Sequence, residues 1–170
     1  MLHIVHFVDR VNKRVGGVIC YLVLVMMLFG VYEVAARYFF NRPTIWVWEL
    51  NGLLQCVFVA LAGGYTLLVR GHVRVDVVYS HLSVRQKAIL DLTTSFFMFS
   101  FLAMLLVHGI DCSFHSFEVS ETSMSMFRPP IWPVKWVLVV GIFLFLLQGV
   151  SYFLKNIYVL GTGKEASDGT

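Results

Sequence analysis

Residues 60–78 read ALAGGYTLLVRGHVRVDVV, an apolar run that ends abruptly at Arg70. Beyond this point, ionisable residues alternate with glycine or valine. The ionisable residues are Arg70, His72, Arg74 and Asp76. A helix that leaves a bilayer has this pattern, because its side chains are apolar within the hydrocarbon and polar where water and lipid headgroups begin. The stretch therefore predicts the polar end of a transmembrane helix.

The composition of the whole chain indicates an integral membrane protein. Of the 170 residues, 58% are hydrophobic and 14% are charged, and the mean hydropathy is +0.78. A soluble protein of this size could not cover so much apolar surface with so few charged groups. The net charge of +3 is scattered, and no basic face is interleaved with aromatic residues. We therefore expect no nucleic-acid partner.

Four apolar runs are each long enough for a helix to cross a hydrocarbon core, which needs ~20 residues. None of them alternates with period two, which argues against a transmembrane barrel. We expect an all-α membrane protein in which residues 1–158 form one four-helix domain and residues 159–170 form a polar cytoplasmic tail. The predicted spans are residues 15–36, 45–69, 88–110 and 131–155.

The stretch before the first span has the pattern of a short amphipathic helix. Ile4, Phe7, Val8 and Val11 are spaced i, i+3, i+4 and i+7, and basic residues follow toward the end of the stretch. We expect this helix to lie on the inner leaflet.

The distribution of charge predicts that both termini are cytoplasmic. With that orientation, the inner segments are residues 1–14, 70–87 and 155–170, which hold nine of the thirteen basic residues. Positive charge accumulates on the cytoplasmic side of membrane proteins. The nine inner residues are Arg10, Lys13, Arg14, Arg70, Arg74, Arg85, Lys87, Lys155 and Lys164. The four outer ones are Arg37, Arg42, Arg128 and Lys135.

The tryptophans predict the same orientation. Trp46 and Trp48 begin the second span, and Trp132 and Trp136 begin the fourth. Tryptophan is enriched at membrane–water interfaces. We therefore expect the four side chains to form an aromatic belt at the outer interface.

The second span carries small residues at every fourth position, one turn after Glu49. They are Gly52, Cys56, Ala60 and Gly64. This spacing places them along one stripe of the helix, where another helix can approach closely. Packing within this chain and packing on another protein are both compatible with the stripe. Glu49 at the membrane edge is costly unless it is paired or hydrated, so either a specific partner or water is expected there.

One group of side chains has the residue types of a transition-metal site. His108, Asp111, Cys112 and His115 are spaced i, i+3, i+4 and i+7. They lie where the third helix should reach the outer surface, and Gly109 and the polar residues after Asp111 suggest that the helix frays there. We therefore favour the interpretation that these four are ordinary helix-end residues that bind no metal.

The remaining patterns predict neither an enzyme nor a cofactor. A haem between the helices would need two histidines at similar depth, and the six histidines lie at or near the ends of the spans. The sequence contains no phosphate-binding loop, Ser-His-Asp arrangement or zinc-protease motif.

The order Gly63-Gly64-Tyr65, an apolar run, and Arg70 to Asp76 resembles the signature of the small membrane subunit of tripartite ATP-independent periplasmic (TRAP) transporters. Gly63-Gly64 stands where many relatives have Gly-Ala, and Gly71 alone separates Arg70 from His72. Several further positions also fit the family pattern. These are Arg37-Tyr38, Trp46 to Glu49, Pro130-Ile131-Trp132, Gly141 and Gln148.

The resemblance implies a non-catalytic scaffold subunit in the bacterial inner membrane, in contact with membrane lipid. Its partners would be a large permease and a periplasmic solute-binding protein, and together they would import an organic anion with a sodium gradient. The resemblance also implies that Arg70, His72, Arg74 and Asp76 form a structural cluster, paired within the turn or with the permease.

Two alternatives remain open. One is the membrane anchor of an oxidoreductase, against which the depth of the histidines argues. A small autonomous four-helix exporter would need a carboxylate near the middle of the first span, and Glu33 comes too late.

Overall fold

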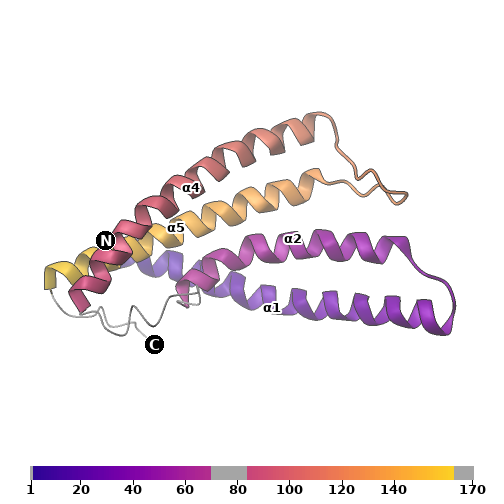
Figure 1. Ribbon diagram of the computed structural model, residues 1–170, viewed down its shortest axis with the longest axis horizontal. Helices are drawn as coiled ribbons and strands as arrows, with labels where there is room; N and C mark the ends of the chain where they lie inside the picture. The colour runs from indigo at the N-terminus through magenta and orange to yellow at the C-terminus, as the bar shows by residue number, and fades with distance from the viewer. Residues whose placement is uncertain (1, 70–83, 163–170) are drawn as a thin grey trace.

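The computed structural model describes residues 2–69 and 84–162. These residues form the helices α1 (Leu2–Phe39), α2 (Ile45–Leu68), α4 (Val84–Glu118) and α5 (Trp132–Thr162), shown in Figure 1. Each helix contains a segment that is long and apolar enough to cross a membrane. The prediction of an all-α protein with four transmembrane helices is confirmed.

The helices form an open fan. Helix α5 packs against α1, α2 and α4, and α2 also packs against α1. Figure 1 shows the order α4, α5, α2 and α1. The pair α4–α5 and the pair α1–α2 diverge toward the end that carries the α1–α2 and α4–α5 connections. Only 6–28% of the residues in each apolar window are buried within the chain. Lipid or another membrane protein must cover the rest, because so much apolar surface is incompatible with water.

The connection between α1 and α2 is set by local backbone chemistry. Asn41 has a left-handed backbone conformation with φ of 50°, which asparagine tolerates better than most residues. The Arg42 N–H then donates to the carbonyl oxygen of Ala36 at 3.0 Å, which satisfies one of the last carbonyls of α1. Pro43 follows and cannot continue a helix. The chain therefore reverses within five residues and begins α2 at Ile45.

Helices α2 and α5 approach closely at Gly141. A Cβ atom added to Gly141 would lie 2.4 Å from the carbonyl oxygen of Ala60. One turn along α2, a Cβ atom on Gly63 would lie 3.0 Å from the ring of Phe145. Small residues permit this approach, and close backbone contact is how helices gain packing energy in lipid.

The amphipathic N-terminal stretch differs from the prediction, because it is not a separate helix. Helix α1 runs without a break from Leu2 to Phe39. Phe7 remains 66% exposed, whereas Val8 is buried. The stretch stays in line with the first span because its polar residues Asp9 and Asn12 bond to α5.

The prediction that the third helix frays after Asp111 is wrong. Helix α4 continues to Glu118. The Ser113 hydroxyl donates to the carbonyl oxygen of Gly109 at 2.7 Å, so this polar residue is satisfied within the helix. The last turns also pack against the start of α5, where the ring centroids of Phe114 and Trp136 lie 5.0 Å apart. Helix α5 is likewise longer than its predicted span, and continues to Thr162.

Candidate functional site

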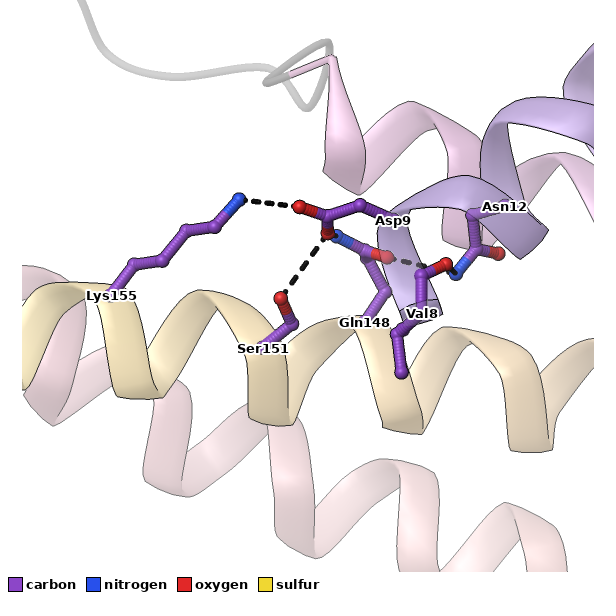
Figure 2. A network of polar contacts seen from close by, with 6 residues as sticks. All are labelled: Val8, Asp9, Asn12, Gln148, Ser151 and Lys155. Carbon is purple, nitrogen blue, oxygen red and sulfur yellow. Dashed lines mark hydrogen bonds and ion pairs between the residues drawn. The ribbon is translucent and has the colours of Figure 1, made fainter. Parts of the chain in front are cut away.

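The main polar feature of the described chain joins the first and last helices. We call Asp9, Asn12, Gln148, Ser151 and Lys155 the α1–α5 polar network. Asp9 and Asn12 are one turn apart on α1, and the three α5 residues recur at i, i+3 and i+7, so each set lies on one face of its helix. Figure 2 shows the two faces turned toward each other.

The carboxylate of Asp9 accepts three of the hydrogen bonds in this network. Its Oδ1 atom accepts from Gln148 Nε2 at 2.8 Å and from Ser151 Oγ at 3.2 Å. Its Oδ2 atom accepts from Lys155 Nζ at 2.9 Å, which forms an ion pair. The Asp9 and Lys155 side chains are 21% and 27% exposed. Partial exposure lowers the cost of holding these two charges, and also the strength of their attraction.

The inner part of the network is amide to amide. Asn12 Nδ2 donates to Gln148 Oε1 at 2.8 Å and to the Val8 carbonyl oxygen at 3.3 Å. Asn12 is fully buried and Gln148 is 2% exposed. Asn12 Oδ1 is buried and accepts no hydrogen bond from the described residues. In a buried site a hydrogen bond between amides is strong, and removing it leaves further polar atoms unpaired at a high cost. The pair therefore fixes the position of α1 along α5.

The glycine–tyrosine part of the predicted signature packs against α1. A Cβ atom on Gly64 would lie 2.3 Å from Asn12 Oδ1, so only glycine leaves space for that oxygen. The next residue, Tyr65, covers Gly16 of α1, where an added Cβ atom would lie 2.4 Å from the ring. These residues therefore hold α1 against α2 beside the polar network.

The predicted small-residue stripe divides into two halves. Ala60 and Gly64 are covered by α5 and α1 of the same chain. Gly52 and Cys56 are exposed, and a Cβ atom on Gly52 would meet nothing within 4 Å. Packing within this chain therefore accounts for Ala60 and Gly64, whereas packing on another protein stays a prediction for Gly52 and Cys56. Glu49 is half-buried, and its Oε2 atom accepts no hydrogen bond from the described residues.

A second polar contact ties α1 to α2 at the opposite end. The Glu33 carboxylate accepts from Arg37 Nη2 at 2.9 Å, from the Thr44 N–H at 3.1 Å and from the Thr44 hydroxyl. Thr44 precedes the first residue of α2. Glu33 therefore anchors the start of α2 to the end of α1.

The loop between α4 and α5 is held by its own contacts. The Ser123 N–H donates to the Pro129 carbonyl oxygen at 2.9 Å, and the Ile131 N–H donates to the Glu121 carbonyl oxygen at 3.0 Å. Lys135 of α5 forms an ion pair with Glu121. The hydrogen bond from this ammonium group lowers the pKa of the Glu121 carboxyl.

The four tryptophans lie at the two helix starts that share one end of the fan. Trp46 contacts Phe29 and Tyr32 of α1, with ring centroids 6.1 and 5.8 Å apart. Trp132 and Trp136 contact rings of α4. Trp48 is 80% exposed.

The remaining predicted residues are not brought into a site. His108, Asp111, Cys112 and His115 are all exposed on α4. Within the described parts of the chain, no group of three or more His, Cys, Asp or Glu residues could hold a metal ion. The four residues of the signature that follow the second helix lie outside the described residues. These are Arg70, His72, Arg74 and Asp76.

Sequence patterns do not predict the α1–α5 polar network, although part of its signal is visible. Gln148 fits a family pattern, and Lys155 contributes to the basic asymmetry. Asn12 and Gln148 are amides at the edge of or within long apolar runs, where polar residues are rare and are usually paired. That rule identifies candidates for pairing but does not say which residue pairs with which.

The arrangement of these groups is suited to holding helices together. Its side chains bond to one another between α1 and α5. The family described as tripartite ATP-independent periplasmic transporters, DctQ component, matches residues 26–157. That match includes the α5 half of the network and excludes Asp9 and Asn12. No curated protein matches the chain.

Proposed function

This chain belongs to the DctQ family, the small membrane component of TRAP transporters, and from that membership we propose that it is the scaffold of a sodium-driven importer of an organic anion. It is a multi-pass membrane protein of a family without enzymatic activity. Family membership sets aside the oxidoreductase anchor and the autonomous exporter. The proposed partners are a large permease and a periplasmic solute-binding protein, and the proposed location is the bacterial inner membrane.

The use of polar groups within the helices is the observation that supports a scaffold role. Asn12 and Gln148 bond to each other, and Asp9 bonds to Gln148, Ser151 and Lys155. These contacts stabilise the arrangement of the helices and leave a mainly apolar exterior. An ion or anion crossing a bilayer needs polar groups along its path. The substrate and sodium pathways are therefore assigned to the large permease.

Uptake by reconstituted vesicles tests this proposal. We expect proteoliposomes that contain this chain, its large permease and the binding protein to accumulate a radiolabelled carboxylate that the binding protein retains. Uptake should require an inward sodium gradient, and vesicles with this chain alone should accumulate nothing, because no predicted span carries an ionisable residue near mid-membrane to bind an anion or a coupling ion. Robust uptake by this chain alone would overturn the scaffold role. Uptake that persists when potassium replaces sodium would overturn sodium coupling.

We also propose that both termini are cytoplasmic, with Trp46, Trp48, Trp132 and Trp136 at the outer interface. Nine of the thirteen basic residues then lie inside. The α1–α2 and α4–α5 connections lie at the same end of the fan, which is consistent with this topology.

Reporter fusions measure that orientation directly. A fusion after residue 80 or residue 165 should give cytoplasmic reporter activity, and a fusion near residue 120 should give periplasmic activity, because positive charge resists translocation. A cytoplasmic reading at residue 120 would contradict the proposed topology.

The cluster of Arg70, His72, Arg74 and Asp76 is proposed to pair within its turn or with the permease. Arg74→Lys keeps the charge but loses the planar group that binds carboxylates through two hydrogen bonds. Reduced uptake in the vesicle assay would support specific pairing. Unchanged uptake in both Arg74→Lys and Asp76→Asn would mean that the cluster is only a topology signal.

A further inference from the structure

Helix α2 is exposed along a single stripe, and only over its first two thirds. Its two flanks pack against α1 and α5. All six exposed residues of Ile45–Leu68 follow the 3–4 spacing of one helix face, and none occurs after Val59. We call them the α2 outer face. They are Ile45, Trp48, Gly52, Gln55, Cys56 and Val59.

Gln55 makes this face a poor surface for lipid. It is the eleventh residue of a 24-residue helix, so it lies near the middle of the span. Its side chain is exposed and forms no hydrogen bond with any described residue. Of the other three amides within the described spans, Asn12 and Gln148 are buried and bonded to each other, and Asn51 lies one turn before Gln55 on α2. Hydrocarbon offers an amide no hydrogen-bond partner, so exposure of Gln55 to lipid tails costs free energy.

The shape of the face suits another helix. Gly52 has open space where a side chain would be, and Cys56 beside it is also small. The same stripe of α2 already accepts a helix at its other end, where Gly141 of α5 lies on the backbone of Ala60. Small residues let helix backbones approach, and glutamine bonds between helices in membranes. Both properties occur together on the α2 outer face.

Two polar residues flank the face near its outer end. Glu49 and Asn51 each have one side-chain oxygen that is shielded from solvent and accepts no hydrogen bond from the described residues. Because the chain itself covers these two atoms, they do not point to an outside partner. The exposed amide of Gln55 is the polar group that a partner can reach. Lipid tails offer it no hydrogen bond, whereas a protein helix can present hydroxyl, amide or basic side chains.

We propose that the α2 outer face binds a transmembrane helix of the large permease, with Gln55 bonded to a polar group of that helix. This inference rests on the proposed function, which supplies the membrane-embedded partner. The partner helix approaches at Gly52 and covers Cys56.

Leucine substitutions at Gly52 and Gln55 test the proposal. Gly52→Leu fills the approach site, and Gln55→Leu removes the amide. Gly17→Leu is the matched control, because Gly17 is exposed on α1 and a Cβ atom there also meets nothing within 4 Å. Each variant is coexpressed with the large permease and purified in detergent through a tag on this chain. The measurement is the ratio of permease to this chain.

We expect Gly52→Leu and Gln55→Leu to lower that ratio about tenfold, which corresponds to ~1.4 kcal/mol of binding free energy. Gly17→Leu should keep the wild-type ratio. All three purified chains should melt at or above the wild-type temperature, because leucine favours a helix and clashes with nothing here. Reduced copurification with an intact melting transition would therefore report the interface and not misfolding.

Three results would overturn the inference. Wild-type ratios in both Gly52→Leu and Gln55→Leu would leave the α2 outer face to lipid. A loss confined to Gly17→Leu would move the interface to α1. A disulfide-linked dimer through Cys56 in oxidised membranes would assign the face to a second copy of the chain. If the wild-type chain itself fails to copurify the permease, the proposed function fails as well.

Discussion

Gly141→Ala is expected to destabilise the purified chain by about 1–3 kcal/mol, the range for inserting a methyl group into a packed core. The new Cβ atom would lie 2.4 Å from the Ala60 carbonyl oxygen and 2.6 Å from its carbon. These are backbone atoms of α2, so no side-chain rotation relieves the clash. Helices α2 and α5 must separate along their contact, and that contact loses dispersion energy along its length.

Thermal unfolding in detergent measures this effect, with Gly30→Ala as the matched control. A Cβ atom on Gly30 meets nothing within 4 Å. That variant should gain up to about 1 kcal/mol, because alanine favours a helix more than glycine does. A Gly141→Ala chain that melts with or above wild type would show that α2 and α5 are not in close contact at this point.

Gln148→Leu is expected to cost about 1–3 kcal/mol, the penalty for leaving a buried polar group unsatisfied. The change removes the acceptor of Asn12 Nδ2 and one donor to Asp9 Oδ1. Asn12 is fully buried and cannot turn to water. Adding Asn12→Leu should recover part of the loss, because the two amides then leave together.

The four chains of this double-mutant cycle are melted under one condition. A coupling free energy of about 1 kcal/mol or more between positions 12 and 148 is expected for residues in direct contact. Gln55→Leu is the matched control, since it makes the same substitution at an exposed position of α2. Strictly additive effects at positions 12 and 148 would contradict the amide pair. A Gln55→Leu chain as unstable as Gln148→Leu would show that loss of any glutamine is damaging.

The helices were predictable from the sequence because hydropathy over ~20 residues measures what a bilayer selects. Helix α2 begins at Ile45 and ends at Leu68, against a predicted span of 45–69. The ends of α1, α4 and α5 were missed because these helices continue beyond the apolar segment. Hydropathy gives no signal there. Hydrogen bonds such as Ser113 to Gly109 and Asn12 to Gln148 keep the polar turns helical.

Which faces meet could not be predicted, for a different physical reason. Spacing reveals that Gly52, Cys56, Ala60 and Gly64 share a stripe, but the crossing of α2 by other helices decides which half is covered. The structure covers Ala60 and Gly64 and leaves Gly52 and Cys56 open. Likewise, the partners Asn12 and Gln148 are 136 residues apart, and no local pattern relates them.

The link between the first and last helices also sets the order in which the fold can be completed during synthesis. Helices α1 and α2 leave the ribosome first, and Glu33 and Thr44 can join them at once, because their bond spans only 11 residues. Asn12 must wait until α5 has been made. Until then an amide and a carboxylate of α1 have no partners from α5, which disfavours burial of that end in lipid. The N-terminal turns of α1 therefore reach their final position only when the last helix enters the membrane.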